Sequence, residues 1–570
     1  MNRRKAKLTA PRAGLFAISL LVGLAGCGSD SEGGFSPALT PTNSPALATP
    51  TSTQVPTRTP SFTGTPTRTI TLTPKPTSPP PTATSTPVPT ATFTLTATNT
   101  VSPAATATAT RTRTPEVTAT PVGSPRPTLP PARTGLYVGI AKRNITPSSP
   151  VFLGGYGFGP GRRSTGVLSP IYVRAMVISN GEQTVAFASN ETQGAFAAYK
   201  RGPFGLTDMR RVVAQATSGA ISADQIVISS DHSHAGPDTT GVWGGLPNAY
   251  MEFLLEQTVG AIVDAWNQMR PAELRVGAVD ATELLRSQFA EPPNDRVDGE
   301  LRILAAYDAD EPQRLRALMI NFAAHATVMG AGNTLISADW PGVVAEGSEA
   351  EWGLDGALVM VADVGRTQPA DRGDLDDVPR LTEYSGRVLA KVREAVAAAS
   401  PLEGTAIAAR QFFMREPYAN PLMDASVLAS VISRSSQPPW LDNMAVGTLV
   451  SGIRVGEAFF AALPGEGYPA IQFELQQRVQ AQKHFVFGLA NDQLGYLIAP
   501  EEGYEQVRAA APGNDNAIFN VSPSIGDHVL CVALDAASAV GFAISEPLAK
   551  CARWAGEDRS LPLTGGPSLP

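Results

Sequence analysis

Residues 225–237 read QIVISSDHSHAGP, in which a short strand rich in β-branched residues runs directly into a polar corner. Side chains at alternate positions of an extended chain point the same way, so His232 and His234 share one side of the strand end. The Gly236-Pro237 step behind them permits a sharp turn. Two imidazoles in this position indicate a metal site or a catalytic corner, and the alternative is a hydrogen-bonded loop pair.

The segments on both sides of this corner alternate between strand-like and helix-like patterns. Apolar periodicity predicts helices over 248–269 and 381–399, and an Asn180-Gly181 turn predicts a hairpin. The expected strands, besides 225–229, are 172–179, 184–188, 318–322, 357–361, 449–455, 485–489 and 529–533. This alternation predicts an α/β fold, with a mixed sheet covered by helices and a metal site at strand ends.

Charge is distributed unevenly along the 570 residues. Residues 1–133 hold 12 Lys and Arg against 3 Asp and Glu, whereas residues 134–570 hold 32 against 48. A folded part this acidic repels polyanions, so no nucleic acid is expected as a partner. The three cysteines exclude a disulfide-dense scaffold and a zinc site built from several cysteines.

The first 27 residues have the pattern of a lipoprotein signal peptide. A basic start precedes an apolar run over 14–24, which has signal-peptide length and is short for a membrane span. The run ends in Leu24-Ala25-Gly26-Cys27, which resembles a bacterial lipobox and implies lipid attachment at Cys27; the alternative is an ordinary secretory signal with a chance cysteine. We therefore expect an exported protein of the bacterial cell envelope, lipid-anchored to a membrane.

Residues 28–133 differ in composition from the rest. Thr-Pro pairs recur and apolar residues are too sparse to build a core, which predicts a disordered Thr/Pro-rich linker that acts as an extended stalk. Residues 134–570 form the expected folded domain.

Other polar groups follow predicted strands. His325 follows the predicted strand 318–322, where a lone histidine is more often a core residue. Asp339, shortly before Pro341, suits either a helix cap or a site carboxylate. Residues 361–369 hold a strand followed by a glycine turn, a place where α/β enzymes put reactive groups. Residues 463–468 and 489–496, which contain Glu466 and Tyr496, read by themselves as loops.

Taken in order, these pieces resemble the N-terminal catalytic domain of the neutral/alkaline non-lysosomal ceramidase family over most of 136–535. The motifs that carry the resemblance are Gly154-Gly155-Tyr156-Gly157, the His-x-His-x-Gly-Pro corner, the strand-end His325, Ser337-x-Asp339-x-x-Gly342, Pro464-Gly465-Glu466 and Gly495-Tyr496-x-x-x-Pro500-Glu501-Glu502. The resemblance implies a zinc-dependent amidohydrolase that cleaves an N-acyl amide bond in N-acylsphingosine, a related lipid or another small N-acyl substrate.

The resemblance also assigns residues to roles. The implied zinc ligands are His232, His325, Glu466 and Tyr496, and His234 is the implied hydrogen-bonding neighbour. Two imidazoles, one carboxylate and one phenol oxygen suit Zn²⁺, which can polarise an amide carbonyl and lower the pKa of a bound water. The remaining catalytic positions carried over are Asp363, Gly365 and Thr367.

Two departures from the family pattern bear on catalysis. Gly365 occupies the place of a serine implicated in attack on the amide; Thr367 or a metal-activated water would have to replace it. An expected tyrosine is also missing after Glu501-Glu502-Gly503-Tyr504, where Arg508 stands. The alternative function is therefore a non-catalytic, ceramidase-like binding module that has lost its nucleophile.

Cys531 and Cys551 remain once Cys27 is assigned to lipid. In an oxidising compartment they can form a disulfide that closes a loop of ~20 residues. The alternative is a pair of free thiols.

Overall fold

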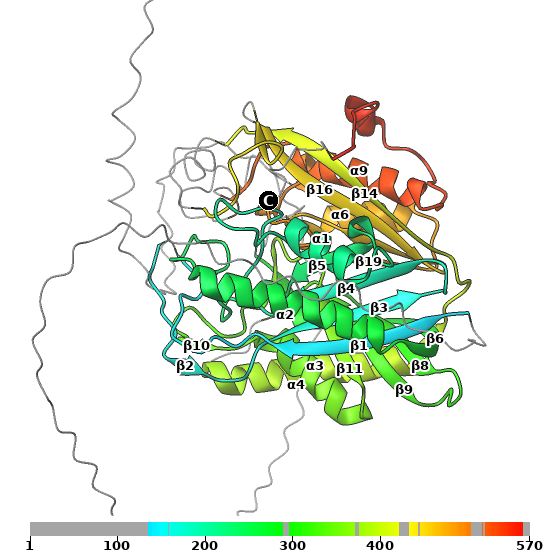
Figure 1. Ribbon diagram of the computed structural model, residues 1–570, viewed down its shortest axis with the longest axis horizontal. Coiled ribbons are helices and arrows are strands. Elements are labelled where there is room, and N and C mark those ends of the chain that lie inside the picture. The colour runs from blue at the N-terminus through cyan, green and yellow to red at the C-terminus, as the bar shows by residue number, and fades with distance from the viewer. Residues whose placement is uncertain are drawn as a thin grey trace, which may run out of the picture. The chain divides into compact units, whose positions relative to one another are not determined.

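A computed structural model describes residues 135–157, 159–288, 296–370, 375–420, 432–442, 445–502, 516 and 519–561 (Figure 1). These residues belong to one compact unit within 118–570. The expected signal peptide, Cys27, the linker up to 133 and residues 503–508 lie outside the described residues. Within the described ranges, no helix combines the length and apolar character that a membrane span needs.

The larger sheet is mixed and follows the order β11-β9-β8-β6-β1-β3-β4-β5. Neighbouring strands run antiparallel except for the pairs β4–β5 and β9–β11. The predicted hairpin is confirmed, since β3 and β4 pair across the Asn180-Gly181 turn. The strands are β1 (Tyr137–Asn144), β3 (Tyr172–Ser179), β4 (Thr184–Asn190), β5 (Ile226–Ser230), β6 (Arg270–Asp280), β8 (Glu300–Asp308), β9 (Leu315–Phe322) and β11 (Gly356–Val361), with β13 (Ser400–Pro401) beside β6.

A second sheet lies face to face with the first. It consists of β14 (Ile407–Pro417), β16 (Ala445–Val455), β17 (Ala458–Ala462) and β19 (Lys483–Phe487), with β15 (Leu441–Asp442) beside β16. Phe187 on β4 lies 5.1 Å from Phe460 and 5.7 Å from Phe487, measured between ring centroids. These aromatic side chains belong to a buried core that joins the two sheets.

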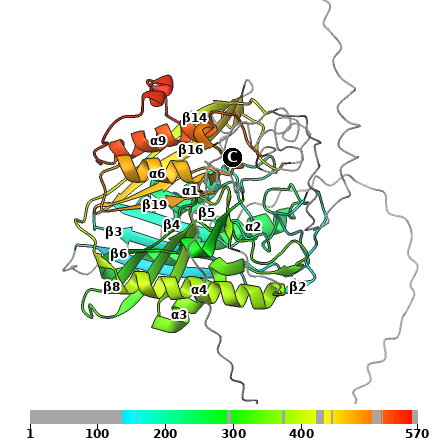
Figure 2. The ribbon, with the colours of Figure 1, turned by 180° about the vertical axis from the view of Figure 1, so that it is seen from behind.

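Helices cover the outer faces of both sheets (Figures 1 and 2). On α4, Leu381, Tyr384, Val388, Val392 and Ala395 recur at helical spacing and are buried, which explains how this helix docks. The first sheet carries α1 (Leu206–Ala216), α2 (Asn248–Asn267), α3 (Asp339–Trp352) and α4 (Asp377–Ala397), and the second carries α6 (Pro469–Arg478) and α9 (Ile525–Ala539). The predicted α/β class is confirmed, but two stacked sheets replace the single sheet expected.

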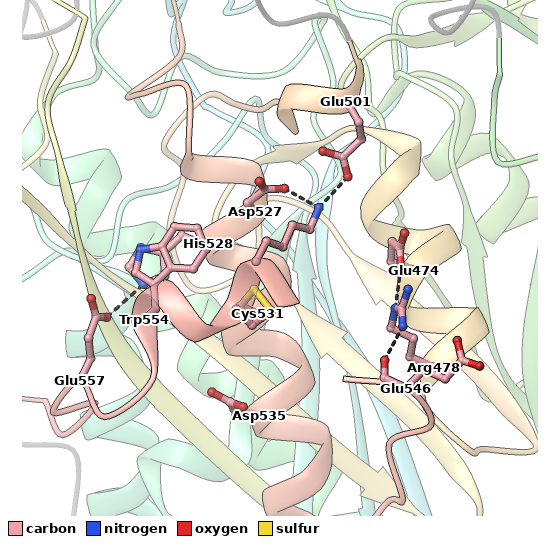
Figure 3. Close-up of a disulfide and its surroundings, with 12 residues drawn as sticks. Glu474, Arg478, Glu501, Asp527, His528, Cys531, Asp535, Glu546, Trp554 and Glu557 are labelled. Carbon is pink, nitrogen blue, oxygen red and sulfur yellow. Dashed lines mark hydrogen bonds and ion pairs between the residues drawn. A yellow bond between two sulfur atoms is a disulfide. The ribbon is translucent and has the colours of Figure 1, made fainter. Parts of the chain in front are cut away.

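The predicted strand at 529–533 is wrong, because these residues lie inside α9. Both faces of this helix are buried, one against the second sheet and one under the short helix η4 (Ala549–Trp554). A continuous apolar run of this kind does not distinguish a strand from a buried helix. Cys531 on α9 and Cys551 on η4 form a disulfide, with Cα atoms 5.3 Å apart (Figure 3).

Short elements complete the described chain. They are β2 (Gly166–Val167), β7 (Leu285–Ser287), β10 (Leu335–Ile336), β12 (Thr367–Pro369), β18 (Glu466–Gly467), β20 (Tyr496–Leu497), η1 (Ala223–Gln225), η2 (Thr282–Leu284) and η3 (Pro500–Glu502). Three pairs of these strands form two-stranded ladders: β2–β10, β7–β12 and β18–β20.

Residues 488–491, which follow β19, bring several strand ends together. The N–H of Gly488 donates to the carbonyl of Val361 at the end of β11, at 3.0 Å. The N–H of Asn491 donates to the carbonyl of Ile228 on β5 at 2.8 Å. Leu489 N–H donates to Gly465 O, at 2.9 Å, just before Glu466. This segment therefore connects β5, β11 and the turn before β18, although β5 and β11 stand at opposite ends of the sheet order.

Candidate active site

His232 follows β5 directly and is held in an unusual backbone conformation, with φ at 62°. Its Nδ1 lies 2.7 Å from the carbonyl oxygen of Gln193. A carbonyl can only accept a hydrogen bond, so Nδ1 carries the proton and donates it. In the neutral ring, Nε2 then presents a lone pair, the form in which imidazole binds a metal.

His325 follows β9 and repeats this arrangement. Its Nδ1 donates to the carbonyl oxygen of Thr367 at 3.1 Å, which again leaves Nε2 as the coordinating atom. The indole N–H of Trp340 donates to the His325 carbonyl at 3.1 Å and fixes its backbone. Both imidazoles are therefore oriented by backbone carbonyls, and their rings lie 5.0 Å apart between centroids.

Glu466, on β18, lies next to both imidazole rings and forms a three-residue cluster with His232 and His325. Its Oε2 atom lies 3.4 Å from Nε2 of His232 and 3.2 Å from Nε2 of His325. This oxygen is buried and has no hydrogen-bond partner with suitable geometry among the described residues. Burial raises the pKa of Glu466, but when the two rings are protonated the charge of His232, together with that of His325, outweighs burial and holds that pKa well below its usual range.

These three residues fit a divalent cation. Two Nε2 lone pairs and an unsatisfied carboxylate oxygen face one point, and each ring is oriented through its other nitrogen. Two imidazoles and a carboxylate are typical ligands of zinc in hydrolases. The residues present therefore match the donor chemistry of zinc.

The resemblance makes His234 a hydrogen-bonding neighbour of the zinc ligands, but its ring nitrogen lies within the same cluster as those of His232 and His325. Its Nε2 is 3.3 Å from Nε2 of His232, and the ligating atoms of His232, His234 and His325 all lie within 4.8 Å of one another. Burial lowers the pKa of His234 well below its ordinary value, and the nearby His232 and His325 lower it further. His234 thus offers a ring nitrogen to the same cluster and can also serve as a ligand.

The glycine-rich motif near residue 155 accommodates the ring of His234. Gly155 has a φ of 97°, and a Cβ at this position would overlap the imidazole of His234. The ring of Tyr156 packs edge-on against the same imidazole, at 4.7 Å between centroids. The motif therefore supports the site, and its close approach to His234 explains why glycine is required.

Tyr496 is the register partner of Glu466 in the parallel pair β18–β20. Its backbone N–H donates to Phe519 O at 2.7 Å, and its carbonyl accepts from Asn520 Nδ2 at 3.0 Å. Tyr496 and Glu466 line the same pocket. The structure thus brings Tyr496 to the site, and its role as a ligand stays a prediction.

The pocket has about 730 Å³ of empty space, including its opening. His232, His234 and Glu466 are among the polar residues that line it. The walls are largely apolar, and the apolar and aromatic side chains among them are Phe196, Val242, Trp243, Tyr418, Ile432, Leu494, Tyr496 and Phe519. This lining suits a molecule that has both an apolar part and a reacting polar group.

Asp363, Gly365 and Thr367 are not among the described residues that line the pocket. Asp363 Oδ2 accepts from the N–H of Gln472 at 3.1 Å, and burial, with Asp298 nearby, raises the pKa of Asp363 well above its usual value. Thr367 contributes through its backbone, because its carbonyl orients His325.

Gly365 has no room for a side chain. A Cβ there would lie 2.6 Å from the carbonyl oxygen of Glu466 and 2.7 Å from that of Gly467. Gly365 N–H also donates to Gly467 O at 2.9 Å. The position that the resemblance assigns to a serine is therefore packed against the strand that carries Glu466.

Asp339 serves the fold at the start of α3. Its carboxylate accepts from the N–H groups of Val328, Met329 and Trp340, at 3.2, 2.7 and 2.7 Å. The sequence allows Asp339 to be either a helix cap or a site carboxylate, and these bonds support a structural role at the start of the helix.

Sequence reasoning missed the contributions of Gln193 and Asp492. Gln193 supplies the carbonyl that orients His232. Asp492 forms a buried ion pair with Arg434, whose Nη2 lies 2.6 Å from Oδ2. A backbone acceptor leaves no local signature in a sequence, and the partner of Asp492 lies 58 residues away along the chain.

Comparison with known proteins agrees with this picture. Residues 136–372 match the family model described as neutral/alkaline non-lysosomal ceramidase, N-terminal. The resemblance drawn from the sequence is confirmed over this segment, which is similar to the neutral/alkaline ceramidase N-terminal domain. A sequence comparison with curated proteins found no match.

Two solved structures share the fold. The neutral ceramidase from Pseudomonas aeruginosa is 17% identical, with a TM-score of 0.58 over 71% of this chain and 74% of that one. A ceramidase complexed with C2 is also 17% identical, with a TM-score of 0.59 over 71% and 75% of the two chains. Family and fold together support a ceramidase-like hydrolase.

Proposed function

We propose that this protein is an exported, lipid-anchored, zinc-dependent hydrolase of an N-acyl amide bond in a ceramide-like lipid. One observation carries the proposal: His232 and His325 turn their Nε2 atoms toward Oε2 of Glu466, while a backbone carbonyl holds each Nδ1. The family match and the apolar pocket support a lipid N-acyl substrate. Export and anchoring rest on the sequence pattern that ends at Cys27.

The zinc ion would be held by His232, His325 and Glu466, with Tyr496 and His234 available beside them. Bound there, zinc would act as a Lewis acid that polarises the acyl carbonyl and stabilises the charge that develops on its oxygen. The absence of cysteine from this set leaves nitrogen and oxygen donors, which suit zinc in catalytic sites.

The remaining chemistry belongs to the protein's own residues. The apolar walls bind the acyl chain and exclude water from it. Gly365 offers no hydroxyl, so the oxygen added to the acyl carbon comes from water. In the overall reaction the hydroxyl group of that water joins the acyl carbon, and its proton goes to the nitrogen as the carbon–nitrogen bond breaks. The products are a fatty acid and an amine.

The direct test is hydrolysis of an N-acyl amide lipid by the zinc-loaded protein, followed as release of free fatty acid. Glu466→Gln keeps the size of the side chain and removes its charge, so we expect it to reduce turnover by at least ~100-fold. Gln477→Glu, on an exposed position of α6, is the matched control and should leave the rate unchanged. Equal rates in the wild type and Glu466→Gln would contradict the proposal.

A second candidate is a ceramidase-like binding module without catalytic activity. The packing of Gly365 against the Glu466 strand favours it, because no side-chain nucleophile fits there. This candidate predicts that lipid binds but that no fatty acid is released. Turnover that disappears in Glu466→Gln would rule it out.

A further inference from the structure

Asp238 follows the His-x-His corner and has a fully buried carboxylate. Its Oδ1 atom accepts hydrogen bonds from the N–H and the hydroxyl of Thr240, at 3.1 and 2.9 Å, and from the N–H of Gly241 at 2.9 Å. Its Oδ2 atom accepts from the N–H groups of Trp243 and Gly245, at 2.8 and 2.9 Å. Hydrogen bonds to a charged acceptor are stronger than those between neutral groups, so this one side chain fixes the backbone of the loop that follows it.

Residues 239–245, which we call the pocket loop, form part of the pocket wall through Thr240, Val242 and Trp243. All three glycines of this loop have a positive φ. Glycine loses more conformational freedom on folding than any other residue, so a loop this rich in glycine needs specific contacts to keep one shape. The carboxylate of Asp238 supplies those contacts from the residue that precedes the loop.

The pocket loop also holds two other parts of the pocket wall. The indole N–H of Trp243 donates to the carbonyl of Gly157 at 2.7 Å, and Gly157 lines the pocket as well. The N–H of Ser433 donates to the carbonyl of Thr240 at 2.8 Å, and both chain neighbours of Ser433 are pocket-lining residues. A displaced loop would therefore disturb the wall in three segments of the chain.

Asp238 itself is not among the described residues that line the pocket, so it acts on a ligand through the loop. The proposed zinc ligands are oriented by other groups: His232 by the carbonyl of Gln193 and His325 by the carbonyl of Thr367. The shape of the pocket wall and the orientation of the metal ligands therefore depend on different hydrogen bonds.

We propose that Asp238 is a positioning residue, whose carboxylate holds the pocket loop in the shape that binds substrate; this inference rests on the proposed function. Loss of the carboxylate leaves four N–H groups and one hydroxyl without their acceptor, so the loop would adopt other conformations as well. The apparent affinity for substrate then falls with the fraction of molecules that keep the binding shape. The chemistry at the histidine cluster, once substrate is bound, stays the same.

Steady-state kinetics of Asp238→Ala with an N-acyl amide lipid test the proposal. We expect KM to rise by at least ~10-fold while kcat changes by less than ~threefold, because substrate binding is weakened and the chemical step is kept. Zinc content, measured by elemental analysis, should stay the same. Asp280→Ala is the matched control and should leave KM unchanged. Asp280 Oδ1 accepts from the N–H and the hydroxyl of Thr282, at 3.1 and 2.6 Å, and Asp280 is not among the described pocket-lining residues.

Asp238→Asn keeps the size of the side chain and one acceptor oxygen, so its KM should lie between those of the wild type and Asp238→Ala. This variant also serves if the alanine variant does not fold. Hydrogen exchange gives a readout that needs no ligand. The amides of Trp243 and Gly245 should exchange at least ~10-fold faster in Asp238→Ala, while those of β5 keep their protection.

An unchanged KM in folded Asp238→Ala would overturn the proposal, and so would a loss of zinc, which would make Asp238 a support of the metal site. The same measurements distinguish this proposal from the catalytic one. If the wild type binds the lipid without releasing fatty acid, weaker binding by Asp238→Ala supports the positioning role and contradicts hydrolysis. Hydrolysis with the same KM in the wild type and Asp238→Ala contradicts the positioning role and leaves the hydrolase intact. A wild type that does not bind the lipid would overturn both.

Discussion

Gly365 packs against the backbone of Glu466: a Cβ at residue 365 would lie 2.6 Å from the carbonyl oxygen of Glu466. The residue that departs from the family pattern is therefore in contact with the strand that carries the carboxylate of the site. Any side chain added at 365 must displace that strand, and the carboxylate would move with it.

Gly365→Ser should therefore fail to create a working nucleophile. We expect overpacking to lower the free energy of unfolding by roughly 1–3 kcal/mol and to weaken metal retention. Denaturant unfolding and metal analysis measure the two effects. Gly386→Ser, on α4 with open space around it, is the control and should change stability by less than about 0.5 kcal/mol. A stable Gly365→Ser with increased turnover would contradict this packing argument.

Zinc should stabilise the folded protein, because it binds the assembled site and not the separated ligands of the unfolded chain. At a free zinc concentration 1,000 times the dissociation constant, we expect about 4 kcal/mol of added stability. Thermal unfolding after chelation and after zinc is restored measures this shift. Glu466→Gln should lose most of it, and an equal shift in wild type and variant would argue for zinc binding elsewhere.

Asp339 predicts a pH dependence of stability. Burial raises the pKa of Asp339 to about 6, although hydrogen bonds from Met329, Trp340 and Val328 lower it. The folded state therefore holds this proton more tightly than the unfolded state, whose pKa is near 3.8. The associated stability is complete below about pH 4 and is lost as the pH rises through 6.

Asp339→Asn removes this titration. The difference in unfolding free energy between wild type and Asp339→Asn should change by up to ~3 kcal/mol between pH 4 and pH 7, to the disadvantage of the wild type at the higher pH. Urea unfolding at a series of pH values measures it. A constant difference across this range would show that Asp339 has the same pKa in both states.

The disulfide between Cys531 and Cys551 should stabilise the C-terminal part of the domain. Its loop spans 20 residues, and the double variant Cys531→Ala/Cys551→Ala should lose about 3 kcal/mol in the chain-entropy model. Neither cysteine is among the described residues that line the pocket, so zinc content should stay unchanged. Loss of zinc in this variant would indicate coupling between α9 and the site.

Much of the fold follows from local patterns in the sequence. The Asn180-Gly181 turn and the apolar periodicity of α2 and α4 predict those elements well, because each pattern lies within one element. The second sheet was not predicted, since strand patterns do not say which sheet a strand joins. The apolar run in α9 predicts a strand, because a helix that is buried on both faces shows no amphipathic periodicity in its sequence.

The site was less accessible to sequence reasoning. The resemblance indicated His232, His325 and Glu466 together, whereas single motifs did not, because their contact depends on residues 488–491 joining distant strand ends. The resemblance identifies Gly365 as the residue at the serine position, but its close packing against the strand that carries Glu466 is visible only in the structure. Gln193 carried no signal, since it orients His232 through a backbone carbonyl, which any residue type supplies.

Zinc stoichiometry tests the central claim most directly. We predict roughly one zinc per chain in the purified wild type by elemental analysis, and a loss of at least ~10-fold in affinity in His232→Ala and His325→Ala. His484→Ala, whose ring contacts the carbonyl of Val479 outside the cluster, should retain the metal. Less than roughly 0.2 zinc per chain in the wild type after zinc loading, unchanged in the two histidine variants, would contradict the account.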